Sequence, residues 1–289
     1  MAVTAALRGT TPFTAGAGVR RRPAMFRALG TADPPPAITL DGETFRRAEI
    51  LKHDSWAATA VYRSPSRVAK CKFNRTQPIG LVPMRWLGKL LARRERWFMS
   101  RLAGIEGVPK SLGVIHLDGR AVKTAIAHEW IPGHALAERE RVADAFFPQL
   151  LGILEAVHRR GVAHVDLHKR ENILVDEAGQ PCLIDYQISF GIPTESRVSR
   201  LLFGGVLRLL QRSDDYHLLK HRLKHRPDQV GLSPAEFERL RPWWIRAHRC
   251  VAVPFRTVRR RLLTALGVRS KTGHAFSEAF PEVAHRRAA

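Results

Sequence analysis

The chain has 289 residues, 45% of them hydrophobic, so it is long and apolar enough to bury a full core. Its formal net charge of +22 favours anionic partners, such as nucleotides, nucleic acid, acidic sugars or an anionic membrane, without choosing among them. Its three cysteines lack metal or disulfide spacing, and no apolar run approaches the ~18 residues of a membrane span. We therefore expect a cytoplasmic protein, at most peripheral to a membrane.

Residues 1–36 are rich in Ala, Gly, Thr, Pro and Arg, have no acidic residue before Asp33, and end in three prolines. This composition predicts a disordered leader. An acid-free leader with arginines also has the character of an organelle targeting peptide, so targeting stays open beside a floppy terminus or a misplaced start codon.

The next part of the chain is rich in predicted strands. Apolar and β-branched stretches predict strands at 48–51, 57–62 and 67–73. Residues 86–102 carry apolar side chains at helical spacing with arginines between them, which predicts an amphipathic helix. Further strands are expected at 112–117 and 122–131.

The second half reads differently. Pro132-Gly133 marks a break, and residues 146–160 have helical spacing that Gly161 is well placed to stop. After Asp185 the chain reads as helices and loops. We therefore expect an α+β protein with a strand-rich part at 37–132 and a helical part at 133–289.

Two polar motifs carry the chemistry. Residues 164–175 read HVDLHKRENILV, and residues 182–187 read CLIDYQ. Asp166 can orient and deprotonate an attacking hydroxyl, while the oxygens of Asn172 and Asp185 suit a hard cation. In this order, after a strand-rich half, the two motifs resemble the catalytic loop and the metal-binding aspartate of protein kinases.

The resemblance implies a bilobal protein-kinase-like fold, with lobes at 37–132 and 133–289, that uses ATP and Mg2+. Asp166 would be catalytic, and Asn172 and Asp185 would hold the metal and nucleotide. Lys169 or Arg170 would neutralise charge on the transferred phosphoryl group.

The resemblance also implies a strand lysine paired with a helix glutamate beside the nucleotide phosphates. Lys70 and Lys72 share one face of a strand because side chains alternate there, and Glu95 lies on the following helix. We prefer Lys72, with Lys70 as the alternative. Either lysine could also be a solvated strand residue, and Glu95 could simply balance an arginine-rich helix face.

Three further segments have open roles. His164 would brace the catalytic loop rather than react. Residues 129–131 fit the hinge that holds adenine, although Trp130 could equally be core. Residues 214–220 resemble a helix that supports the catalytic loop, and Asp214 as a helix cap is the alternative.

The chain departs from the ordinary protein-kinase pattern. It lacks a glycine-rich loop, so residues 54–59 would have to cover the phosphates. Asp166 and Asn172 are six positions apart (172 − 166) where the pattern has five, so the loop must bulge. Gln187 replaces a glycine of the kinase pattern, and the loss of glycine's backbone freedom argues against a switch between active and inactive states at this segment. Residues 193–195 come too soon for a long activation segment.

Over residues 45–225 the chain resembles the bacterial lipopolysaccharide kinases, which phosphorylate Kdo or heptose sugars. This resemblance implies a glycolipid acceptor at the inner membrane face. Residues 256–263 combine bases with an apolar side, which suits an anionic membrane surface or a solvated basic helix. The alternatives are a protein serine/threonine kinase and a catalytically silent nucleotide-binding scaffold. Nucleic acid is a poor fit because no recognition motif is present.

Overall fold

The computed structural model describes residues 23–193 and 195–245, with single positions up to 264. Residues 1–22 and most of the basic segment 256–263 therefore lie outside the described residues.

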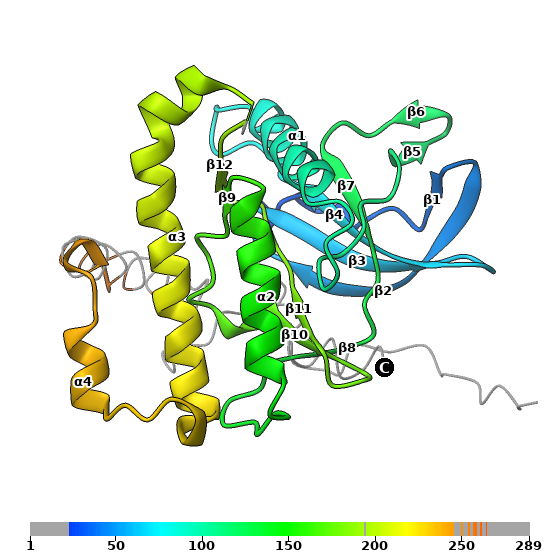
Figure 1. Cartoon of the computed structure of the whole chain (residues 1–289). Helices are drawn as coiled ribbons and strands as arrows, with labels where there is room; N and C mark the ends of the chain where they lie inside the picture. The colour runs from blue at the N-terminus through cyan, green and yellow to red at the C-terminus, as the bar shows by residue number, and fades with distance from the viewer. Residues whose placement is uncertain are drawn as a thin grey trace, which may run out of the picture.

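A seven-stranded sheet in the order β6-β5-β1-β2-β3-β4-β7 forms the first part of the described chain, and its neighbouring strands pair antiparallel (Figure 1). Its strands are β1 Ala37–Leu40, β2 Glu43–His53, β3 Ala57–Arg63, β4 Val68–Asn74, β5 His116–Leu117, β6 Arg120–Ala121 and β7 Ala125–Glu129. In β4 the buried residues Ala69, Cys71 and Phe73 alternate with Lys70 and Lys72. Alternation therefore puts both lysines on the face opposite the sheet's apolar core.

Helix α1, Arg85–Arg101, packs on β4 and β7 (Figure 1). Its buried side includes Ala92, Glu95 and Phe98, spaced three residues apart, as expected for one helical face. A Cβ at Gly88 would lie 2.3 Å from the carbonyl oxygen of Arg75, so only glycine lets the helix approach the chain this closely.

The second part of the described chain is mainly helical, with α2 and α3 side by side (Figure 1). Its helices are α2 Phe146–Arg159, α3 Arg197–His225 and α4 Pro234–Arg239. Five short strands pair in two small sheets: β8 Gly133–Ala135, β9 Val162–Ala163, β10 Ile173–Asp176, β11 Pro181–Leu183 and β12 Phe190–Gly191. None of the described helices is long and apolar enough to cross a membrane.

The main hydrophobic core lies directly beneath the polar motifs. Phe147, Leu150 and Leu154 of α2 pack in one cluster with Leu167 and Tyr186, which sit inside the two motifs. Burying these neighbours removes apolar surface from water and fixes the backbone between them. The core thus holds the reactive side chains at a defined position.

The expected mixed α/β character is present, and the sheet with its helices is compatible with a kinase-like fold. The strands expected at 57–62 and 67–73 and the two helices at 86–102 and 146–160 are found close to their predicted bounds, whereas the strand expected at 48–51 is part of the longer β2, Glu43–His53. The strand expected at 112–117 is regular only at β5. Strand β1 was not predicted, because its four residues carry little pattern of their own.

The predicted leader needs a correction. Residues 23–36 are ordered: Arg27 is 3% exposed and donates hydrogen bonds to Asp33 (2.5 Å) and His53 (2.8 Å). The backbone of Ala28 also donates to the carbonyl of Asp54. A boundary at residue 36 is therefore too late, because these contacts reach a strand more than 20 residues away and leave no local pattern.

We expect Leu150→Ala to lower the free energy of unfolding by about 2–5 kcal/mol, because its side chain is fully buried in the main core. Urea denaturation measures the loss. Leu151→Ala is the matched control on the same helix: with 38% of the residue exposed, it should cost under about 1 kcal/mol. Equal losses would contradict the buried face assigned to α2.

Candidate active site

A cleft of about 820 Å3 lies between the seven-stranded sheet and the helical part. Its lining includes all five residues that the sequence analysis selected: Lys72, Glu95, Asp166, Asn172 and Asp185. They come from β4, α1, the loop after β9, and the segment after β11. The volume is in the range of small-molecule sites.

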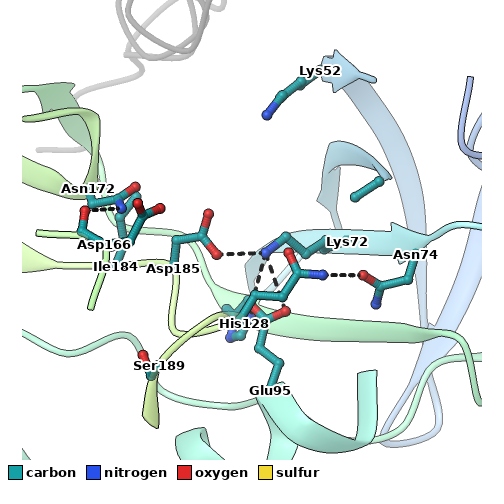
Figure 2. Close-up of polar contacts among 12 residues, drawn as sticks. Lys52, Lys72, Asn74, Glu95, His128, Asp166, Asn172, Ile184, Asp185 and Ser189 are labelled. Atoms are coloured by element: carbon teal, nitrogen blue, oxygen red, sulfur yellow. Dashed lines mark hydrogen bonds and ion pairs between the residues drawn. The ribbon is translucent and has the colours of Figure 1, made fainter. Parts of the chain in front are cut away.

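Lys72 links the two sides of this cleft (Figure 2). Its Nζ donates to Glu95 Oε1 at 3.2 Å and to Asp185 Oδ1 at 2.9 Å. Burial alone would lower the pKa of Lys72, but the two carboxylates outweigh burial and raise it. Burial alone would raise the pKa of Glu95 and Asp185, but Lys72 outweighs it and lowers both. All three groups are therefore charged at neutral pH, and the structure pairs Lys72, not Lys70, with Glu95.

His128 of β7 is a site residue that the sequence analysis missed. Its Nε2 donates to Glu95 Oε1 at 3.2 Å, so the buried glutamate has two partners. The sequence offered one indirect signal: His128 directly precedes residues 129–131, the segment expected to form the hinge.

A buried carboxylate in α3 holds the loop that carries Asp166. Asp214 is fully buried and accepts the backbone N–H groups of His164 at 2.7 Å and Val165 at 2.9 Å. Val165 has φ +68°, a conformation that costs free energy for a β-branched residue. Asp214 lies in the middle of α3, so the expected support of the loop is confirmed and the helix-cap alternative is wrong.

Two histidines brace the same loop. His164 is buried and its Nε2 donates to the carbonyl of Ile184 at 2.9 Å, the structural role expected of it. His221 Nε2 donates to the carbonyl of Leu167 at 2.9 Å, which the sequence analysis did not predict. His221 follows Asp214 by seven residues (221 − 214), so both lie on one face of α3, and this spacing was the available signal.

The six-position spacing from Asp166 to Asn172 includes a 3₁₀ turn at Arg170–Asn172. Asn172 Nδ2 donates to the carbonyl of Asp166 at 3.0 Å, which closes the loop. Lys169 Nζ lies 2.7 Å from Asp166 Oδ2, and His168 Nδ1 lies 3.3 Å from Oδ1. Of the two expected cations, Lys169 reaches Asp166, and Arg170 donates to the carbonyl of Leu136 at 3.0 Å.

Hydrogen bonds connect the segment after Asp185 to β4, to α1 and to the catalytic loop. Asp185 has φ +66°, and Gln187 Nε2 donates to Asn74 Oδ1 on β4 at 2.8 Å. Arg94 of α1 donates to the carbonyl of Ser189, whose hydroxyl donates to His164. Gln187, at the position of the kinase glycine, therefore connects this segment to the sheet. Its hydrogen bond to Asn74 joins residues 113 positions apart.

The other expected cleft segments line it as well. Asp54, in the turn between β2 and β3, accepts the N–H groups of Trp56 and Ala57 and lies 2.6 Å from Lys52 Nζ. Trp130 lines the cleft after β7, and its ring packs with Leu51 and Val61 in a small apolar cluster.

The donor set fits a magnesium nucleotide. Lys72 uses Oδ1 of Asp185 and Asn172 donates through Nδ2, which leaves Asp185 Oδ2 and Asn172 Oδ1 for other partners. In the part of the chain that the structure describes, no three His, Cys, Asp or Glu side chains form a metal cluster. Two oxygens suit Mg2+, which takes one or two protein ligands and completes its shell with phosphates and water.

Sequence comparisons give distant matches, and no family model matches the chain. A CBL-interacting serine/threonine-protein kinase 20 of Arabidopsis thaliana is 38% identical over 78 residues, 24% of this chain and 18% of the kinase. A CBL-interacting protein kinase 25 of Oryza sativa subsp. japonica is 27% identical over 192 residues, 61% of this chain and 36% of the kinase. The chain thus spans about a third or less of the length of the curated relatives it matches.

These matches support a distant relationship to the protein-kinase-like superfamily. They give no support to the narrower resemblance to lipopolysaccharide kinases.

Proposed function

We propose that the chain is an ATP- and magnesium-dependent phosphotransferase with a bilobal kinase-like architecture and a hydroxyl acceptor. One observation carries the proposal: Lys72 paired with Glu95, together with Asp166, Asn172 and Asp185, lines a single cleft although these residues come from four separate segments. A silent scaffold has no chemical need for this combination.

Asp166 is the proposed base. Its side chain is 5% exposed, and Lys169 holds Oδ2; the buried Oδ1 lies 3.3 Å from His168 Nδ1 but accepts no hydrogen bond from a described residue. That oxygen is suited to accept a hydrogen bond, and then the proton, from an acceptor hydroxyl. Lys169 orients the carboxylate and adds positive charge beside the reacting group.

Lys72 is the proposed phosphate ligand, held ready by Glu95 and Asp185. Magnesium, when bound, would neutralise phosphate charge, and Asp185 and Asn172 carry the oxygens to hold it. The buried Glu95 stays charged and keeps Lys72 extended into the cleft.

For the acceptor we propose a protein serine or threonine hydroxyl, in line with the names of the two similar kinases. A lipopolysaccharide-type sugar is the second candidate. One observation favours it: only 12 positions separate Asp185 from the first residue of α3 (197 − 185), which leaves little chain for a peptide-docking segment.

Asp166→Asn should lower phosphoryl transfer by about 10²–10⁴-fold, because a neutral amide cannot take the proton. The assay follows labelled γ-phosphate of ATP, with magnesium, into generic proteins and into core glycolipids that carry Kdo or heptose. Asp118→Asn, an exposed change in the turn between β5 and β6, is the matched control. Labelled glycolipid alone would promote the sugar acceptor, and ATP binding without transfer would refute the proposed enzyme.

Asp214→Asn should reduce transfer and lower the melting temperature while ATP binding persists. The amide has one accepting oxygen, so a backbone N–H of the loop loses its partner, at a cost of about 1–3 kcal/mol. Asp215→Asn changes the neighbouring, 55% exposed side chain and should leave transfer unchanged. Similar effects of both substitutions would show that the loop does not depend on Asp214.

Lys70 should be an unusually reactive amine. It lines the cleft and donates no hydrogen bond to a described residue, and burial lowers its pKa to about 8 despite the opposing attraction of Asp185. The neutral, nucleophilic form therefore grows as pH rises through 8. Trinitrobenzenesulfonate labelling, read by mass spectrometry, should follow this titration, and bound ATP should slow it.

Lys70→Met should remove that labelling, whereas Lys110→Met, which changes a lysine that is 78% exposed, should not. A titration of Lys70 that is complete only near the ordinary lysine value of about 10.4 would contradict its burial in the cleft.

A further inference from the structure

The first half of α3 exposes an unusual number of apolar side chains. The exposed fractions are 68% for Val198, 85% for Leu201, 64% for Leu202, 49% for Phe203 and 46% for Val206. We call these five residues the α3 apolar face. Monomeric proteins expose few such contiguous groups, and those that persist commonly mark an interaction surface.

This face is not needed to anchor the helix. Leu207 points the other way and is buried in a cluster with Ala163 and Ile192. Farther along, Asp214 and His221 hold the catalytic loop. Figure 1 shows the first half of α3 rising past the end of α2.

The second half of α3 has its outer side covered. Tyr216 stacks on Phe237 of α4 with ring centroids 5.0 Å apart, and Trp244 Nε1 donates to Ser213 Oγ at 2.9 Å. This cover ends at Ser213. The α3 apolar face, from Val198 to Val206, lies N-terminal to this cover.

The charged residues from 196 to 213 are all positive, although the acidic Glu195 precedes the helix. Residues 196–213 contain four arginines and no acidic residue. These arginines, all exposed and without an ion pair to any described residue, are Arg197, Arg200, Arg208 and Arg212. Elsewhere arginines do find carboxylates, as Arg226 does with Asp228. Apolar side chains beside unpaired cations are the composition of helices that lie on anionic bilayers.

Helix α1 also exposes large apolar side chains, and its last residue lies near the segment before α3. It exposes Trp86, Leu90 and Trp97. Arg101 lies over the Trp97 ring, 5.5 Å from its centroid, and 3.8 Å from Glu195, just before α3. Tryptophan is enriched where proteins meet the membrane interface.

A second copy of the chain fits the face less well. In a two-fold interface the same patch contacts itself, which would bring the arginines of both copies together and repel. An anionic lipid surface removes that repulsion and covers the leucines.

We propose that the α3 apolar face docks the protein on an anionic phospholipid surface. The leucines enter the headgroup boundary and the flanking arginines contact lipid phosphates and carboxylates. This binding is independent of phosphoryl transfer, so it stands or falls separately from the proposed function.

Flotation of the full chain with vesicles tests the proposal. Wild type should float with phosphatidylcholine vesicles that contain phosphatidylserine and much less with phosphatidylcholine alone. Leu201→Ser/Leu202→Ser should weaken binding on the order of tenfold or more, since two apolar side chains leave the lipid. Arg200→Gln/Arg208→Gln should weaken only the binding to anionic vesicles.

Leu240→Ser is the matched control for the single substitution Leu201→Ser. It changes a leucine after α4 that is 53% exposed, and it should leave vesicle binding unchanged. The melting temperature of each variant is measured in parallel. Vesicle binding that survives Leu201→Ser/Leu202→Ser, for example through the basic C-terminal segment, would overturn the proposal.

Two other results would also overturn it. A dimer in light scattering that the double leucine variant dissociates, without vesicle binding by wild type, would assign the face to a second copy. A large fall in melting temperature with unchanged vesicle binding would mean that the chain itself covers the face.

Discussion

The carboxylate of Asp214 is the contact on which the reactive geometry depends. This carboxylate lies in the interior, where it accepts hydrogen bonds from the backbone N–H groups of His164 and Val165. Those bonds compensate the left-handed backbone of Val165, which in turn sets the direction of Asp166. Because Asp214 belongs to the longest described helix, packed on the main core, the loop inherits the rigidity of α3. A loop held only by its own residues would not be fixed in position relative to the core.

Electrostatic balance organises the rest of the cleft. Lys72 is shared by Glu95 and Asp185, so the sheet, α1 and the segment after β11 meet at one ammonium group. Glu95 is buried and Asp185 is partly buried, and the buried Glu95 would be the costlier one to leave unpaired. Lys70, on the same strand face, has no such partner among the described residues, and its lowered pKa follows from that difference. The pKa values of two lysines two positions apart are thus shifted in opposite directions for a purely tertiary reason.

The basic residues of the chain likewise differ in whether a carboxylate lies beside them. In the cleft, Lys72 and Lys169 are matched by carboxylates and serve local geometry. Along the first half of α3 the arginines are unmatched and lie beside exposed leucines. Net charge alone described neither arrangement, since charge reports on solubility and association rather than on where each group lies.

The sequence by itself determined the elements with a strong local period and the identity of the polar motifs. Strands β3 and β4, helices α1 and α2, and the roles expected of Asp166 and Asn172 all rest on residues that are neighbours along the chain. Only the tertiary structure decided which strand lysine meets Glu95, that residues 23–36 are ordered, and that Asp214 holds the loop. It alone revealed His128 on Glu95 and Gln187 on Asn74. These contacts join residues 33 and 113 positions apart, and no local periodicity encodes a distance of that kind.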